Sequence, residues 1–347
     1  MVAGQRGRAS RSATGHASTR RGFVAGMAAG GVAVVAGRSL PGAVAQAASV
    51  KPCEPTPPGV RTTAIAATRD GRTFWTADAA ATTITAHRRD DLRRGRSIDV
   101  GGAPVDIAIA PDGRRALVTT ASYDNPGLVL VDLRTGHVDH LDVGPEPYAV
   151  AFTASGRSAY VSGGGREGTL TRVDPRTGRV HAPVPVGAHA RGLALHPDGK
   201  HALVALNGEA AVAVVALRKG RIVRRIATPL FPAQLAVSPD GRRALVTHNG
   251  FGDRRVTPLD LVAWRARRPI ATGLDPAGVA FGRSGTLALV ANAGAGTVCV
   301  LDARTGRRRR RVTTGGTPRH VVISGRQGIV ADGHTGRLTA VRLSGGR

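Results

Sequence analysis

The chain repeats itself about every 43 residues along most of its length. The residues AIAPDGRRALV at 108–118 return almost unchanged as AVSPDGRRALV at 236–246, with the glycines of the two copies 128 residues apart. Aligning every Asp-Gly turn, or the segment that replaces it, gives spacings of 42 to 44 residues, so 128 is three periods. The aligned glycines are Gly71, Gly113, Gly156, Gly199, Gly241, Gly285 and Gly328.

Each period predicts four short β-strands joined by tight turns. An alternating strand runs into Pro-Asp-Gly, and a second strand such as RALVT at 115–119 follows at once. A third strand ends in aspartate, as LVLVD does at 128–132, and an Arg-Thr-Gly turn leads into a fourth strand at 137–143. Proline fixes φ, aspartate caps the turn, and glycine supplies the positive φ that closes a hairpin. No segment between the strands shows the 3.6-residue hydrophobic periodicity of a helix. We therefore predict an all-β, seven-bladed β-propeller with four-stranded antiparallel blades.

The predicted propeller occupies residues 59–347 as one domain, because a lone blade cannot bury both of its faces. The blades are expected at about 59–100, 101–143, 144–186, 187–228, 229–272, 273–314 and 315–347. The seventh blade is short, since the segment at 337–344 reads as its third strand and the chain ends soon after. A proline-rich segment at 48–58 either replaces the fourth strand or lies over the surface, and its prolines favour an ordered strap.

The pattern of Gly-x-x-Pro, Ser-Pro-Asp-Gly, Tyr-Val and Asp-x-x-Thr-Gly resembles the YVTN-type β-propeller repeat of secreted YncE-like and surface-layer proteins. The resemblance covers residues 59–347, and no blade carries the Gly-His or Trp-Asp signatures of WD repeats. Some blades depart from it: the first has TRDG at 68–71, Ser155 and Ser284 replace the turn aspartate, and the seventh uses SGRQG. The resemblance implies the fold and says little about activity, because its repeated residues form turns and core.

Residues 1–47 have the features of a signal peptide for export. Its first part contains arginines and no acidic residue, and an apolar stretch interrupted by glycines follows. The sequence AVAQA, made of small residues, ends the segment. Arg20 and Arg21, followed by Phe23, resemble the twin-arginine type of signal, which exports folded proteins. The apolar stretch is too short for a transmembrane anchor. We expect cleavage after Ala47 and an extracellular, periplasmic or cell-wall-associated protein without a membrane anchor.

The chain is strongly basic, with a formal net charge of +26 at pH 7. Six arginines leave with the signal peptide, which lowers the charge to about +20. Such a balance favours anionic partners, namely cell-wall polymers, an acidic membrane surface or nucleic acid. A solvated basic surface in an arginine-rich proteome explains the same composition. Exposed charge acts over only about 8–10 Å in physiological salt, so it sets encounter rates, and we expect no specific nucleic acid.

Neither the two cysteines nor any short motif in the sequence indicates a cofactor-binding site. Export would permit a disulfide between Cys53 and Cys299. Cys299 lies in the alternating segment TVCVLD, which favours a small buried apolar residue over a disulfide partner. Two cysteines are too few for a cysteine-based metal cluster, and CxxCH, GxSxG, Walker and dinucleotide motifs are missing. We therefore expect no cofactor, no metal and no catalytic residue.

Ligand sites of such rings lie at the mouth of the central channel, where loops enter the innermost strands, or on the loops between second and third strands. The two residues after the proline, or after its equivalent, are expected to vary with function. These pairs are Thr63-Ala64, Val105-Asp106, Tyr148-Ala149, Arg191-Gly192, Ala233-Gln234, Ala277-Gly278 and Arg319-His320. The predicted ligand-binding residues are Asp106, Glu146, Tyr148, His189, Arg191, Gln234, Arg319 and His320. Their mixed chemistry suits a small anionic or polar ligand, although seven loops also gather polar residues without any ligand.

The loops between second and third strands carry amides and carboxylates in most blades. They are Asp78, Asn207, Asn249, Asn292 and Asp332. Metal-dependent six-bladed lactonases gather such residues around a central cation. Asparagine and aspartate also tolerate positive φ, so turn chemistry explains them without a metal. Five arginines at 307–311 fall in the predicted outermost strand of blade six, where charge blocks strand addition; a polyanion patch is the alternative.

These observations predict a non-catalytic, monomeric binding or interaction module at the cell envelope. Its partner is a protein, a wall polymer or a small anionic ligand. The alternative is a lactonase-like or lyase-like hydrolase that uses His189, Arg191 and His320 at the channel mouth, because seven-bladed phosphogluconolactonase-like proteins have similar repeats. Electron-transfer or cofactor chemistry is suggested only by the twin-arginine signal. The fold alone does not separate these functions.

Overall fold

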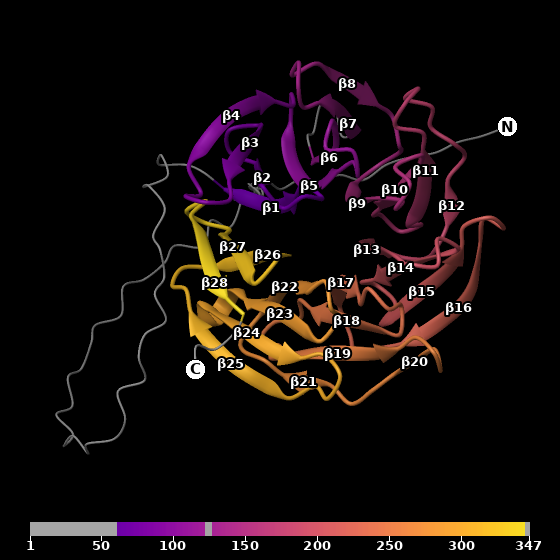
Figure 1. Ribbon diagram of the computed structural model, residues 1–347. Coiled ribbons are helices and arrows are strands. Elements are labelled where there is room, and N and C mark those ends of the chain that lie inside the picture. Colours follow the sequence, from indigo (N-terminus) through magenta and orange to yellow (C-terminus); the bar gives the residue numbers. More distant parts are fainter. Residues whose placement is uncertain (1–60, 122–126, 344–347) are drawn as a thin grey trace, which may run out of the picture. The chain divides into compact units, whose positions relative to one another are not determined.

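The computed structural model describes residues 61–121 and 127–343, which lie in the second of the chain's two units, Ala47–Arg347. The described residues form seven antiparallel β-sheets and one short 3-10 helix, η1 (Ala293–Ala295). The first strand of each sheet packs against the first strand of the next, and the last sheet packs against the first. Figure 1 shows the resulting ring of blades. The predicted all-β, seven-bladed β-propeller is confirmed. In this part of the chain, no helix is long and apolar enough to span a membrane.

The first three blades follow the predicted order of four antiparallel strands, paired in chain order. Blade one consists of β1 (Thr62–Ala67), β2 (Thr73–Asp78), β3 (Thr83–Arg88) and β4 (Arg94–Asp99). Blade two consists of β5 (Ala103–Ile109), β6 (Arg115–Ala121), β7 (Gly127–Asp132) and β8 (Val138–Leu141). Blade three consists of β9 (Pro147–Phe152), β10 (Ala159–Gly163), β11 (Thr169–Val173) and the short β12 (Val184–Pro185).

The later blades keep this order with two departures. Blade four consists of β13 (Ala190–Leu195), β14 (His201–Leu206), β15 (Ala211–Ala216) and β16 (Arg221–Ala227). Blade five consists of β17 (Pro232–Val237), β18 (Arg243–His248), β19 (Arg255–Asp260), β20 (Arg265–Ala266) and β21 (Ile270–Ala271). Blade six consists of β22 (Pro276–Phe281), β23 (Leu287–Asn292), β24 (Thr297–Asp302) and β25 (Arg308–Thr313). Blade seven has three strands among the described residues: β26 (Pro318–Ser324), β27 (Gln327–Asp332) and β28 (Leu338–Arg342).

Glycines with positive φ close the first hairpin of each blade. The aligned glycines of blades one to six have φ between 65° and 71°. In blade seven the prediction of Gly328 was wrong, because the turn uses Gly325, with φ of 60°. Ser324 pairs directly with Gln327, so this hairpin is tighter than a Pro-Asp-Gly turn, and Gly328 lies inside β27. The period therefore shortens at the last blade.

The outer strand of blade five is broken into β20 and β21. Both segments pair with β19, and residues 267–269 between them belong to neither strand. Pro258 in β19 and Pro269 between β20 and β21 have no N–H to donate, so the ladder loses two donors at one place. The N–H of Arg267 still donates to the carbonyl of Pro258 at 2.8 Å.

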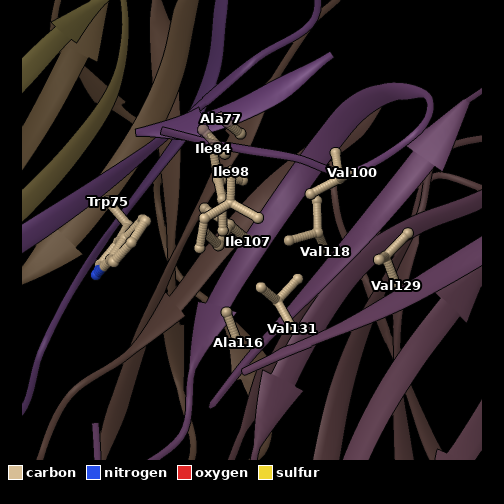
Figure 2. Packing of buried hydrophobic residues seen from close by; sticks show 11 residues of the cluster. Trp75, Ala77, Ile84, Ile98, Val100, Ile107, Ala116, Val118, Val129 and Val131 are labelled. Carbon is tan, nitrogen blue, oxygen red and sulfur yellow. The ribbon is translucent and has the colours of Figure 1, made fainter. Parts of the chain in front are cut away.

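Apolar side chains fill the space between neighbouring blades. Figure 2 shows one such cluster, in which Ile84 and Ile98 of blade one meet Ile107 and Val118 of blade two. Cys299 is a buried free thiol whose Sγ donates to the carbonyl of Thr272 at 2.9 Å, which confirms its predicted burial. The partner considered for it in the sequence lies outside the described residues, as do the predicted signal peptide and strap.

The ring closes by packing of blade seven against blade one. Phe74 of blade one and Leu338 of blade seven belong to one buried cluster. Ser324 donates a hydrogen bond to the carbonyl of Gly71 at 3.2 Å across this junction. The described residues therefore close the ring through side-chain packing between the two blades, and β26 lies against β1 as the other first strands lie against their neighbours.

Candidate ligand site on the rim of the ring

The innermost strand of every blade contains a β-bulge next to its first residues. The pairing of first and second strands shifts register there in all seven blades. The first residue of each predicted pair falls in this shift: Thr63, Val105, Tyr148, Arg191, Ala233, Ala277 and Arg319. A bulge leaves a residue out of the ladder and turns its side chain from the regular alternation. The bulge therefore takes one rim residue per blade out of the ladder, and these seven range from the buried Ala233 to the exposed Arg319.

Arg191 of blade four is held by side chains of both neighbouring blades. Its guanidinium carbon lies 5.1 Å from the centre of the Tyr148 ring in blade three. With the amide of Asn249 oriented so that its oxygen faces the arginine, Arg191 Nη1 donates to that oxygen at 3.1 Å. A cation over an aromatic face is stabilised by about 0.5–2 kcal/mol. Two contacts therefore fix the guanidinium, and its other donors have no partner among the described residues.

Two asparagines of neighbouring blades meet beside this arginine. Asn207 Nδ2 donates to the carbonyl of Pro232 at 3.0 Å and lies 2.9 Å from the side-chain amide of Asn249. In the orientation given above, the Asn249 amide nitrogen donates to the carbonyl of Phe231 at 3.1 Å. The sequence assigned both asparagines to turn chemistry alone. In the structure Asn207 also links blades four and five through the carbonyl of Pro232, and Asn249 places its amide oxygen against the guanidinium.

Four loops that enter consecutive blades carry a large residue with left-handed backbone. Glu146, His189, Phe231 and Asp275 have φ of 48°, 52°, 57° and 51°. Each carbonyl accepts an N–H from the loop between the second and third strands of its blade. Glycine adopts such φ values without strain, whereas other residues store roughly 1–3 kcal/mol there. The strain places four bulky or charged side chains on one arc of the rim.

Exposed apolar side chains occur in the two loops that hold Asn249 and the residue it bonds to, Phe231. Leu230, Phe231 and Phe251 are 65%, 47% and 110% exposed. The ring of Phe231 lies against Gly250, the neighbour of Phe251 in the β18–β19 loop. We call Tyr148, Arg191, Asn207, Phe231 and Asn249 the rim site. It combines a fixed cation, two amides and aromatic surface.

Asp106, one of the predicted ligand residues, joins blades two and three. Its Oδ2 accepts the N–H of Val150 in β9 at 3.0 Å, and its Oδ1 accepts the N–H of Ile107 at 2.9 Å. Burial raises the pKa of Asp106 to about 6, because desolvation of the charged form outweighs these two hydrogen bonds. Both carboxylate oxygens are therefore already in use within the fold.

Among the described residues, three other predicted ligand residues make no side-chain hydrogen bond to the rim site. Gln234 is half-buried in blade five, and its backbone N–H donates to Thr247 Oγ1 at 3.1 Å. Arg319 of blade seven is exposed and its stem lies over Gly333. Burial, assisted by the charge of Arg319, lowers the pKa of His320 to about 4, so its imidazole is neutral at pH 7. Within the described residues no hydrogen bond joins these side chains to the rim site.

The remaining polar loop residues serve their own turns. Asp78 Oδ1 accepts the N–H groups of Arg61, Ala80 and Ala81. Asp332 Oδ1 accepts the N–H groups of its turn, and Asn292 bonds to Thr297 across the end of its hairpin. The described residues contain no group of three or more His, Cys, Asp or Glu side chains placed to hold a metal ion.

Two rim residues were missed by sequence reasoning. Phe231 and Asp275 occupy the aligned position that holds Glu146 and His189 in blades three and four. The repeat alignment contained this signal. The sequence prediction included Glu146 and His189 from this column and left out Asp275, although it is also charged, and the backbone strain that all four share is visible only in the structure.

The fold and the rim together define a seven-bladed β-propeller with a candidate ligand site at the entrances of blades three to five. No family matches the sequence, and no curated protein matches it. Among solved structures, the chain is similar to a chain of hydrazine synthase from Kuenenia stuttgartiensis, with a TM-score of 0.75 and 19% identity. The match covers 87% of this chain and 99% of that one. At this identity the similarity shows the fold alone.

Proposed function

We propose that this chain is an exported, non-catalytic binding module of the cell envelope whose rim site takes a small anionic ligand. The observation that carries the proposal is Arg191, fixed between the ring of Tyr148 and the amide of Asn249 with donors to spare. Arginine recognises carboxylate or phosphate through two parallel N–H bonds. Because the side chain is already held, binding costs less conformational freedom than it would for a mobile arginine.

The side chains around Arg191 narrow the class of ligand. Asn207 and Asn249 carry amides that donate to and accept from hydroxyl groups. Phe231 and Phe251 offer exposed aromatic surface, which packs against the apolar C–H face of a sugar ring. An acid group on a hydroxylated ring with one apolar face satisfies all of these groups. We therefore propose an anionic sugar, either a uronic acid or a sugar phosphate.

Export and location rest on the sequence. In this proposal the twin-arginine-type signal at residues 1–47 directs the chain out of the cytoplasm, its repeats belong to the YVTN type, and its basic surface draws it to anionic wall polymers. Replacing Arg20 and Arg21 by lysine is expected to retain the chain in the cytoplasm of a host that has twin-arginine transport. Cell fractionation measures this, and equal export of both forms would contradict the proposal.

Calorimetric titration of the full chain with glucuronate and glucose 6-phosphate tests the rim site. We expect at least one of the two to bind, glucose to bind more weakly, and Arg191→Gln to lower the affinity at least tenfold. Arg319→Gln is the matched control, because it removes a rim arginine that lies apart from the site, and it leaves the affinity unchanged. Equal loss in both variants, or no binding of either anion, contradicts the proposal.

The hydrolase alternative has its own readout. Turnover of gluconolactone that disappears in His320→Gln would replace the binding function by the enzymatic one. His320 contacts none of the rim-site residues through a hydrogen bond in the described part of the chain, so this variant is expected to leave sugar-acid binding intact. The two functions are thereby separated by one substitution.

A further inference from the structure

A groove of about 830 Å³ lies between blades five and six. It is formed by the hairpin turns β17–β18, β19–β20 and β24–β25 and by the broken outer strand of blade five. The β18–β19 loop of the rim site is at the opposite end of these strands, because successive strands are antiparallel. The groove is therefore a separate site.

The groove exists because the outer strand of blade five is interrupted. After the Arg267 N–H, which still bonds to Pro258, the regular pairing with β19 is interrupted until Ile270, and the gap between β20 and β21 faces blade six. On the other side, Gly306 lies against the side chain of Ile270. The two prolines that break the strand thus create a recess at the blade junction.

The lining of the groove is rich in arginine. Its arginines are Arg242, Arg243, Arg265, Arg267, Arg268 and Arg304. Its acidic residues are Asp240, Asp260 and Asp302. Six cations and three anions leave an excess of positive charge in a partly enclosed space, where charges are screened less than on an open surface.

Each aspartate of the lining already has hydrogen-bond and ion-pair partners within its own hairpin. One carboxylate oxygen of each accepts N–H groups of the turn, and the other accepts from an arginine. The ion pairs are Asp240–Arg243 at 2.9 Å, Asp260–Arg267 at 2.5 Å and Asp302–Arg309 at 2.5 Å. The hydroxyl of Ser238 lowers the pKa of Asp240 to about 2, and the N–H of Ala263 with Arg267 lowers that of Asp260 to about 2. The carboxylates stay charged. Because both oxygens of each already accept hydrogen bonds, they do not serve as counter-ions for the other arginines of the lining.

Four arginines of the lining have no counter-ion. Arg242, Arg265, Arg268 and Arg304 are exposed, and their side chains form no hydrogen bond or ion pair with the described residues. Arg243 has unused donor capacity as well, since its Nε is shielded from solvent without an acceptor in the described part of the chain. The uncompensated guanidinium groups come from three separate chain segments around one recess. Such an arrangement has the donors to hold several anionic groups at once.

We propose that this groove binds an oligophosphate chain. Phosphate oxygens accept bidentate hydrogen bonds from arginine, and Arg265, Arg268 and Arg304 can each serve a different phosphate of one chain. A groove of this volume exceeds what one phosphate fills. Phe281 is the aromatic residue of the lining, whereas single-stranded nucleic acids are bound on several stacked aromatics. The ligand is therefore a run of phosphates without bases.

Calorimetric titration of the full chain with inorganic triphosphate tests this site. The groove variant is Arg265→Gln with Arg268→Gln. The control is Arg221→Gln with Arg224→Gln, which removes the same charge from exposed positions on the outer strand of blade four. We expect wild type and control to bind triphosphate equally, the groove variant to bind at least tenfold more weakly, and orthophosphate to bind at least tenfold more weakly than triphosphate.

Three results would overturn the proposal. Equal weakening in the groove and control variants would show attraction by net charge alone. Equal affinity for orthophosphate and triphosphate would exclude an oligophosphate as the ligand of the groove. Tighter binding of a single-stranded oligonucleotide of equal charge would identify the ligand as a nucleic acid instead. Arg191→Gln is expected to keep full triphosphate affinity, so failure of the rim site and failure of the groove remain distinguishable; loss in Arg191→Gln would assign the anion to the rim instead.

Discussion

The guanidinium of Arg191 receives its position from residues that are far apart in the sequence. Tyr148 lies one repeat earlier, and Asn249 lies in the following blade. Each repeat contributes one side chain, and the ring brings the three together at the blade junctions. An arginine in this setting is more ordered than the many solvated arginines of the chain, which have long, mobile side chains. Order of this kind is what distinguishes a recognition residue from general positive charge.

Tyr148→Leu is expected to weaken binding of the rim-site anion by about 2–5-fold, because the ring face that positions Arg191 contributes about 0.5–1 kcal/mol at a partly exposed site. Tyr148→Phe keeps the ring and is the control, with unchanged affinity. Calorimetry with the sugar acid that the wild type binds measures both variants. An equal loss in Tyr148→Phe would show that the hydroxyl, and not the ring face, carries the contribution.

Asp106 predicts a pH dependence of folding. Its pKa is about 6 in the folded chain against an ordinary value of 3.8, so the folded state holds the proton more tightly. The folded state then binds more protons than the unfolded state between pH 4 and pH 6, and the stability supplied by this group falls as the pH rises through that window. Two pKa units correspond to about 3 kcal/mol.

Asp106→Asn removes this titration and retains an amide oxygen as acceptor. We expect the wild type, relative to the variant, to be more stable at pH 4 than at pH 7.5. Denaturant unfolding at both pH values gives the four free energies of unfolding, and their double difference cancels histidines such as His87, whose pKa burial lowers to about 4. A double difference near zero would show that the pKa of Asp106 is not raised.

At the scale of elements, the regular parts of the fold followed from the repeat. Alternating strands and turn residues specify local hydrogen bonding, so four strands per period could be placed without tertiary information. Gly328 was misplaced because SGRQG offers two glycines, and the shorter hairpin uses Gly325. The break in the outer strand of blade five was missed because Pro258 lies in β19 and Pro269 lies between β20 and β21, and only the pairing of β19 with β20 and β21 brings these segments together.

The rim site was also only partly predictable, because the repeat specifies positions within a blade and not contacts between blades. The repeat alignment predicts that Tyr148 and Arg191 occupy equivalent rim positions. It does not predict which rim side chains contact each other. Asp106 was selected with them, yet its carboxylate turns to the backbone of β9. Side-chain direction at a bulge depends on the neighbouring blade, which sequence alone does not supply. Contacts between blades are the information that was missing.

Close approach between blades gives a prediction for two rim glycines. A Cβ on Gly192 would lie 2.3 Å from the carbonyl oxygen of Ala233, and one on Gly278 would lie 2.4 Å from that of Arg319. Both obstacles are backbone atoms of the next blade, which cannot rotate aside. Each glycine-to-alanine change is expected to lower the free energy of unfolding by about 1–3 kcal/mol.

Gly95→Ala is the matched control for these two variants. Gly95 lies in the outer strand β4, and a Cβ there would meet the carbonyl oxygen of Ala86 at an ordinary 3.6 Å. Denaturant unfolding is expected to give a free energy within about 0.5 kcal/mol of the wild type or slightly higher. Equal stability of all three variants would show that the blades can separate at the rim without cost.

At the scale of the whole molecule, the ring depends on the junction where its two ends meet. The other junctions join blades that are adjacent in the chain, whereas blades one and seven meet through packing between distant segments. Leu338 is fully buried there, in the same cluster as Phe74. If the ring is one cooperative unit, weakening this junction destabilises every blade, and not only the two that touch.

Leu338→Ala is expected to lower the free energy of unfolding by about 2–5 kcal/mol, the usual cost of removing a buried leucine side chain. The two tryptophans report on different parts of the ring, since Trp75 lies in blade one and Trp264 follows β19 in blade five. Adding Trp264→Phe or Trp75→Phe leaves one reporter at a time for fluorescence-detected unfolding. We expect the leucine variant to shift both midpoints equally, because closure at one junction stabilises the entire ring. A shift seen by Trp75 alone would mean that blade one opens independently, and the ring would then be a chain of weakly coupled blades.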